Sequence, residues 1–260
     1  DVLIALVDKS LLCLTEVDSE PRFLMLSVIQ EYVEQRLELE DEVTDTYRRH
    51  VHHFLRIAEQ AAPELKGHDH ARWFRRLDRE LDNSRVALAR ILHAGDYLNA
   101  ARLAVALAYF WYVRGYTKEG SGILEDILSR AEEQLEPQLH IQLLHSAGMM
   151  ALGHGDYLSA KRRYEQKLEL ARHSGDWDGV ERALGNLGII ASSLGDFATA
   201  RSYYEQSLEL VQRPQQTGAH ATFLIKLGSV AFGQGESAAA ESFFRQSLQL
   251  KESVGDPNGI

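Results

Sequence analysis

The chain has 260 residues, with 28 Lys and Arg against 38 Asp and Glu, a formal net charge of −10, and 45% hydrophobic residues. This balance is typical of a soluble globular or solenoid protein and disfavours broad electrostatic binding to nucleic acid or to an anionic membrane. No stretch approaches the roughly 20 consecutive apolar residues that a membrane-spanning helix needs.

The only cysteine, Cys13, lies in the apolar run Leu11-Leu12-Cys13-Leu14. Without a second cysteine the thiol has no intrachain disulfide partner, and in an apolar run it is expected to be a buried small hydrophobe. We therefore expect no redox or catalytic role for this residue and a cytoplasmic location for the protein.

Residues 1–42 alternate between helical and extended patterns. "DVLIALVDKSLLCL" predicts a short helix followed by a strand, "VDSEPR" a turn, "FLML" a second strand, and "SVIQEYVEQRLELE" a helix with Ser27 as a candidate N-cap. Helix, two-stranded wing and helix correspond to the second half of a winged-helix domain, so 1–42 is predicted to be a partial winged-helix segment.

Residues 43–96 separate this segment from the repeat region, and a family resemblance described below implies that they form a helical linker. Their basic residues Arg72, Arg75, Arg76 and Arg79 suit the solvated face of a helix. A local basic patch is the alternative interpretation of the same spacing.

Residues 97–260 contain an internal repeat. Turn signals begin at Gly155, Gly195 and Gly235, at intervals of 40 residues, with a weaker copy at Gly115. Other residue types recur in register with these turns. They form columns of glycine (Gly148, Gly188, Gly228), alanine (Ala160, Ala200, Ala240), aromatic residues (Tyr164, Tyr204, Phe244) and leucine (Leu168, Leu208, Leu248).

These columns predict pairs of antiparallel helices. A Gly-Asp pair ends one helix with a residue that tolerates positive φ and starts the next with an N-capping side chain. The small residues let helices approach closely, and the aromatic and leucine columns are expected to fill the space between neighbouring hairpins. The fold class is therefore mainly α, a right-handed α-solenoid of ~40-residue helical hairpins preceded by the short β-wing and the helical linker.

The segment "LGNLGIIASSLGDFATARSYYEQSLEL" resembles the tetratricopeptide repeat. The usual repeat is about 34 residues, and we expect the longer form here to place "ARHSGDWDGVERA" in the connection between hairpins. The resemblance, which extends to kinesin light chains and Rap-type sensors, implies a concave surface that binds a partner. The ending "LQLKESVGDPNGI" aligns with the start of a further repeat, so we expect the parent protein to continue.

The residues "LVDKSLL" and "RFLMLSVIQEYVEQRL", followed by "YRRHVHHFLRIAEQAAPEL", look like the winged helix and linker of STAND-type signal-transduction ATPases of the LuxR and SARP type. In that family many members carry Met-His-Asp where this chain has Met25-Leu26-Ser27, so the family's nucleotide contact is not carried over. No phosphate-binding loop is present. We therefore expect ATP or ADP only on an upstream ATPase module, and an intramolecular contact of the wing with that module.

No catalytic or metal-binding set stands out. His50, His52 and His53, with His68 and His70, are the only candidate metal cluster, but they lack a His-Glu-x-x-His motif and a cysteine partner and suit a polar helix face. The acidic run at Glu38, Glu40, Asp41 and Glu42 is interpreted as a solvated helix end. We therefore predict a protein that is not an enzyme, with no cofactor and no metal in this segment.

Candidate partner-binding residues follow from the resemblance, which places polar residues at positions two and six of each first helix. Here these positions are Gln142, Ser146, Arg182, Asn186, Thr222 and Lys226. Arg182, Asn186 and Lys226 are expected to converge on a carboxylate or a peptide backbone, as a partial match to a carboxylate clamp. The alternative is a set of scattered surface polar residues along the groove.

The aromatic run from Tyr109 to Tyr116 is expected to be mostly core at the junction of linker and repeats, with one or two rings exposed to the groove; a ligand pocket at this run is the less favoured alternative. The leading hypothesis is a sensor and interaction segment of a STAND-type regulator, to which an inducer, peptide or protein binds and shifts the packing of the winged helix. A constitutive assembly scaffold is the alternative. A DNA-binding winged helix is disfavoured by the acidic balance.

Overall fold

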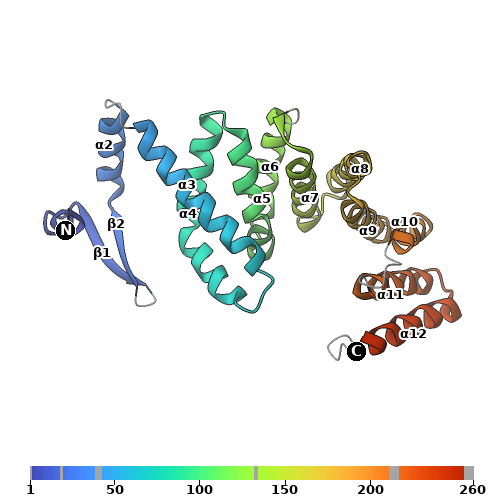
Figure 1. Ribbon diagram of the computed structural model, residues 1–260. Helices are drawn as coiled ribbons and strands as arrows, with labels where there is room; N and C mark the ends of the chain where they lie inside the picture. Colours follow the sequence, from blue (N-terminus) through green and yellow to red (C-terminus); the bar gives the residue numbers. More distant parts are fainter. Residues whose placement is uncertain (1, 18–19, 39–42, 132–133, 211–216, 255–260) are drawn as a thin grey trace. The chain divides into compact units, whose positions relative to one another are not determined.

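The computed structural model describes residues 2–17, 20–38, 43–131, 134–210 and 217–254 (Figure 1). The chain divides into two compact units, residues 1–53 and 54–260. Within the described residues, no helix is both long and apolar enough to cross a lipid bilayer.

The first unit contains a helix, a β-hairpin and a second helix in the predicted order. Its elements are α1 (Val2–Asp8), β1 (Leu12–Val17), β2 (Glu20–Met25), α2 (Ser27–Glu38) and the first part of α3 (Val43–Glu64). The two strands pair antiparallel, with Leu12 opposite Met25 and Val17 opposite Glu20. The second strand thus begins at Glu20, inside the segment predicted as a turn. Asp18 and Ser19, at the centre of that turn, lie outside the described residues.

The predicted burial of Cys13 is wrong, because its thiol is exposed. Successive residues of a strand point to opposite faces of the sheet. Leu12 is covered, with 8% of its surface exposed, whereas Leu14 on the same face of the strand and Cys13 on the opposite face are both exposed. The apolar run consequently indicated a strand correctly but did not indicate which of its side chains would be covered.

The second unit is a succession of helices. After the end of α3 it contains α4 (His70–His93), α5 (Tyr97–Arg114), α6 (Thr117–Ala131), α7 (Pro137–Gly153), α8 (Tyr157–Ser174), α9 (Trp177–Ser193), α10 (Phe197–Leu210), α11 (Thr217–Gly233) and α12 (Ser237–Val254). Four hairpins, α5–α6, α7–α8, α9–α10 and α11–α12, follow one another in the described part, each second helix packing on the first helix of the next hairpin. The predicted mainly helical fold of repeated hairpins is confirmed. The acidic residues Glu40, Asp41 and Glu42 and the C-terminal residues 255–260 lie outside the described ranges.

The Gly-Asp turns inside the hairpins have the predicted geometry. Gly155 and Gly195 have φ angles of 85° and 79°, in the left-handed region that favours glycine. The Asp156 carboxylate accepts a hydrogen bond from the Ser159 backbone N–H at 3.0 Å, which caps α8. Each turn therefore ends one helix and starts the next within two residues.

The same turn also joins one hairpin to the next, which corrects the predicted long connection over "ARHSGDWDGVERA". Gly175 has φ 70°, and Asp176 accepts a hydrogen bond from the Gly179 backbone N–H at 2.9 Å. The flanking residues belong to α8 and α9, and only these two residues connect them. The additional length of the repeat thus lies in its helices.

In the last three hairpins, a glycine of the first helix packs against an aromatic ring of the second helix. A Cβ atom placed on Gly188 would lie 2.3 Å from the Tyr204 ring, and Gly148 with Tyr164 and Gly228 with Phe244 repeat this contact. The Tyr204 ring also faces Phe223 of the next hairpin, with centroids 6.3 Å apart. The aromatic column, expected between hairpins, is therefore packed most closely inside its own hairpin.

We expect Gly188→Ala to lower the free energy of unfolding by about 1–3 kcal/mol, because the added methyl group forces the Tyr204 ring or one helix to move. The measurement is urea denaturation followed by circular dichroism. Gly122→Ala is the matched control: it lies in helix α6, and a Cβ there would meet no atom within 4 Å. This variant should be neutral or slightly stabilising, and equal losses in both variants would contradict the packing argument.

Candidate functional site

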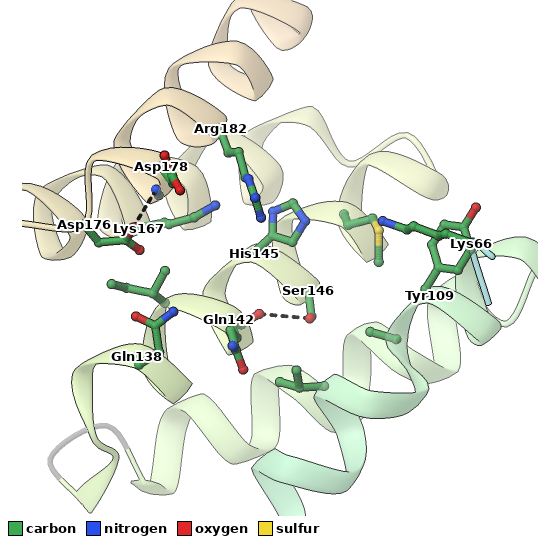
Figure 2. Close-up of a pocket in the computed structure, with 15 residues that line it drawn as sticks. Lys66, Tyr109, Gln138, Gln142, His145, Ser146, Lys167, Asp176, Asp178 and Arg182 are labelled. Atoms are coloured by element: carbon green, nitrogen blue, oxygen red, sulfur yellow. Dashed lines mark hydrogen bonds between the residues drawn. The ribbon is translucent and has the colours of Figure 1, made fainter. Parts of the chain in front are cut away.

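A pocket of about 320 Å³ lies among the first helices of three successive hairpins. Residues of α5, α7 and the start of α9 line it, together with Lys66 from the turn after α3 and Lys167 from α8 (Figure 2). Its polar lining residues are Lys66, Tyr109, Gln138, Gln142, His145, Ser146, Lys167, Asp176, Asp178 and Arg182.

Lys167 is the deepest charge in this pocket. Only 2% of its surface is exposed, and no hydrogen bond or ion pair joins its ammonium group to another residue that the structure describes. Burial, and next the positive charge of Arg182, lowers the pKa of Lys167 to about 8. The ammonium group therefore carries its charge at neutral pH in an unfavourable environment.

His145 faces the same interior from α7. Its Nδ1 atom is buried and has no hydrogen-bond partner, and its ring lies 5.9 Å from that of Tyr164. Burial first, and then the surrounding cations Lys167, Arg182 and Lys66, lowers the pKa of His145 to about 3. The imidazole is consequently neutral and has one polar atom without a partner.

Charged residues from several helices surround Lys167 and His145 in the pocket. Figure 2 shows Arg182 and Lys167 extending toward the His145 ring from two different helices. The pocket's acidic residues lie at the start of α9, where the Asp176 carboxylate is used to cap that helix. Lys66 lies over the Tyr109 ring, with its Nζ atom 4.6 Å from the ring centroid. Three cations, Lys66, Lys167 and Arg182, thus line the pocket, with the carboxylates Asp176 and Asp178 at its α9 end.

Three of the six predicted partner-binding residues line this pocket: Gln142, Ser146 and Arg182. Gln142 and Arg182 are exposed on their helices and available to a ligand. Ser146 is 4% exposed, and its hydroxyl donates a hydrogen bond of 2.9 Å to the backbone oxygen of Gln142. Its role in the pocket is therefore that of a buried lining residue.

The other three predicted residues, Asn186, Thr222 and Lys226, do not line the pocket. Asn186 and Thr222 form hydrogen bonds to the backbone oxygens of their own helices. The Lys226 ammonium group lies over the Phe223 and Tyr204 rings, at 4.9 and 5.4 Å from their centroids. Arg182 thus lines the pocket, whereas Asn186 and Lys226, with which it was expected to converge, do not.

The aromatic run is partly core and partly accessible. Phe110 and Trp111 are fully buried, whereas Tyr109 lines the pocket and Tyr112 is exposed. Among the described residues, no group of three or more His, Cys, Asp or Glu side chains is arranged to hold a metal ion.

The sequence prediction missed Lys167, His145 and Lys66. Lys167 lies on the second helix of its hairpin, whereas only first helices were considered. The sequence contained one signal, because the positions 40 residues before and after Lys167 hold the uncharged residues Ile127 and Ser207. A charged residue in a column of uncharged residues could have drawn attention to Lys167.

Comparison with known proteins agrees with the repeat geometry. Two family models, both described as tetratricopeptide repeat, match residues 139–213 and 221–254. These ranges cover hairpins α7–α8, α9–α10 and α11–α12 almost completely. The chain contains tetratricopeptide repeats. Stacked repeats of this kind create extended concave binding surfaces.

A curated relative is named "Putative HTH-type transcriptional regulator Rv0890c", from Mycobacterium tuberculosis (strain ATCC 25618 / H37Rv). It is 27% identical over 197 residues, which cover 71% of this chain and 21% of the relative. The chain therefore spans about a fifth of the length of the curated relatives it matches.

Solved structures resemble the chain in fold. The crystal structure of BtubC from P. vanneervenii has a TM-score of 0.60 at 17% identity, covering 82% of this chain and 93% of that chain. Aspartyl phosphate phosphatase F from Bacillus subtilis has a TM-score of 0.62 at 12% identity, covering 98% of this chain and 61% of that chain. At these identities the likeness establishes a shared helical-repeat fold.

We expect Lys167→Met to raise the free energy of unfolding at pH 7 by on the order of 2–3 kcal/mol, because it removes a buried charge without a partner. The unfolded chain holds the lysine proton up to its ordinary pKa of 10.5, and the folded chain releases it at about 8. Wild-type stability therefore rises with pH across this window. The gain of the variant should accordingly be largest below pH 8 and vanish near pH 10.5.

Urea denaturation at pH 7, 8.5 and 10 measures this dependence. Lys161→Met is the control on the same helix, since Lys161 is exposed and pairs with Glu165 at 3.8 Å. Its effect should be small and nearly constant over the same pH range. A Lys167→Met variant that is less stable than wild type at pH 7 would contradict the unfavourable burial of this charge.

Proposed function

We propose that the repeats bind an extended protein or peptide segment and form the sensor and interaction part of a larger regulator. The observation that carries this proposal is the pocket on the first helices. The residues at its border are exposed and occupy the same position in successive repeats. Gln142 and Arg182 border it, and Thr222 continues the row on α11. The protein acts in this proposal by binding and has no catalytic role.

The surface that would receive the partner is the face formed by these three first helices, called here the first-helix face. It consists of residues three or four positions apart on each helix, which therefore lie on one side of it. Its members are Gln142, His145 and Met149 on α7, Arg182, Asn186 and Ile189 on α9, and Thr222, Ile225 and Ser229 on α11. Amide, hydroxyl and cationic groups alternate here with apolar side chains, which suits a peptide backbone with mixed side chains.

The regulator part of the proposal is supported by the order of the elements and by one relative. The N-terminal unit has the helix, strand, strand, helix order expected of a winged-helix segment, and long helices precede the repeats. The curated relative carries the name of an HTH-type transcriptional regulator and is about five times longer than the matched segment. We propose that the chain belongs to a STAND-type protein of the cytoplasm in which an upstream ATPase module, and not this segment, holds ATP or ADP.

Peptide display against the 260-residue chain tests the binding proposal. We expect enriched peptides to lose at least tenfold in affinity, about 1.4 kcal/mol, when Thr222→Trp or Asn186→Trp fills the first-helix face. Both side chains bond only to backbone oxygens of their own helices, so the fold should tolerate the replacements. Fluorescence polarisation with labelled peptides measures the loss.

Glu205→Trp on α10 is the control, since Glu205 is exposed on a second helix. It should leave every affinity unchanged. Peptides that bind all three variants as tightly as wild type would show that the first-helix face is not the binding surface.

The regulator proposal has its own test in the longer protein that carries this segment. Deletion of residues 97–260 should abolish ligand-dependent control of ATP turnover, because the ligand would no longer favour one arrangement of the chain. The measurement is phosphate release with and without the partner. Regulation that persists after the deletion would contradict the sensor role. A stable partner with no effect on turnover would instead favour a constitutive scaffold.

A further inference from the structure

The repeat places a buried side chain at the Lys167 position in each hairpin. The equivalent residues are Ile127, Ser207 and Ser247, with 0%, 0% and 2% of their surfaces exposed. Ser207 donates a hydrogen bond to the backbone oxygen of Tyr203, and Ser247 to that of Ala221. Three of the four repeats thus fill this site with a side chain that is apolar or internally satisfied.

Lys167 departs from this pattern at an energetic cost. Removing an ammonium group from water without a partner is strongly unfavourable, whereas an opposite charge in the same low-dielectric surroundings compensates for it. No described residue forms an ion pair with Lys167, although its side chain lines an open pocket. A negatively charged ligand in the pocket could therefore supply the compensating charge.

The surroundings favour a negatively charged group in that place. Arg182 extends into the pocket from α9, and its exposed guanidinium group supplies a second positive charge there (Figure 2). His145 adds a buried Nδ1 atom without a partner, and a neutral imidazole offers one N–H donor. A carboxylate or phosphate group accepts from all three kinds of donor at once.

We propose that the pocket binds a compact anionic group, a carboxylate or a phosphate, with Lys167 and Arg182 as its charge partners and His145 as a hydrogen-bonding partner. The inference deepens the proposed function, on which it rests in part, by naming the chemistry that the ligand brings to the first-helix face. Because the protein as a whole has a net charge of −10, it does not attract anions at long range. An anion would therefore be bound by short-range contacts with the cations of this pocket.

This site differs from the clamp expected on the sequence. The expected convergence of Arg182 with Asn186 and Lys226 used first helices alone, whereas the buried cation here comes from the second helix α8. The anion has two possible sources, a free small molecule or an acidic side chain of a bound protein segment. The chemistry is the same for both, and the experiment separates them.

Isothermal titration of the 260-residue chain at constant ionic strength is the test. One set of probes is sodium succinate and sodium phosphate, with succinamide as the neutral counterpart. The other set is the peptide Ac-Gly-Ala-Glu-Glu-Ala-Gly-NH₂ and its Gln-Gln analogue. We expect saturable binding by members of at least one charged set and none by the neutral counterparts. Binding confined to the first set indicates a small molecule, and binding confined to the acidic peptide indicates a protein segment.

Variants decide whether the binding takes place in this pocket. Lys167→Met and Arg182→Gln should each weaken the charged probe at least tenfold, whereas Lys161→Met should bind it like wild type. Circular dichroism confirms that each variant is folded, and Arg182, being exposed, offers a substitution that leaves the core intact. Affinity that is unchanged in both pocket variants, or no saturable binding by any charged probe, would overturn the inference.

The same variants separate this inference from the proposed function. No saturable binding by any charged probe, together with display-selected peptides that lose affinity with Thr222→Trp, would refute the anion site and leave the peptide-binding face in place. Conversely, succinate binding could be lost in Lys167→Met while selected peptides bind Thr222→Trp and Asn186→Trp as tightly as wild type. This result would support the anion site and refute the first-helix face as the peptide-binding surface.

Discussion

The hairpins α7–α8, α9–α10 and α11–α12 each depend on a contact between a glycine of the first helix and an aromatic ring of the second. Because a Cβ on Gly188 would lie within 2.3 Å of the Tyr204 ring, only glycine permits this approach of the two helices. The ring then reaches Phe223 of the next hairpin. One contact thus sets the separation of the helices within a repeat and contributes to the packing between repeats.

The pocket follows from this arrangement. Close packing within α7–α8 brings Lys167 on the second helix into the space between the first helices α7 and α9. A lysine there is deprived of water and lies near Arg182, with whose charge it interacts unfavourably. Natural proteins often accept unfavourable local interactions at binding sites, because the ligand supplies the missing partner. The proposed anion site is an instance of this general relation.

The architecture of the repeats was largely predictable, whereas the binding site was predictable only in part. Turns at Gly155, Gly195 and Gly235 depend on local backbone chemistry, which a short sequence window contains. The Gly-Asp turn at Gly175 was overlooked as a helix connection, although it lies midway between two recognised turns. Arg182 lines the pocket, but its expected convergence with Lys226 depended on side-chain directions that no periodicity encodes.

The sequence by itself determined the 40-residue period, the helix boundaries at the Gly-Asp turns and the glycine, alanine and aromatic columns, because each of these is contained in the order of residue types along the chain. The tertiary structure alone decided that Cys13 is exposed, that Lys167 is buried without an ion-pair partner among the described residues and that His145 lies near it. These outcomes depend on which neighbouring element covers a side chain. Such coverage arises from contacts between distant segments, and a pattern along one segment does not contain it.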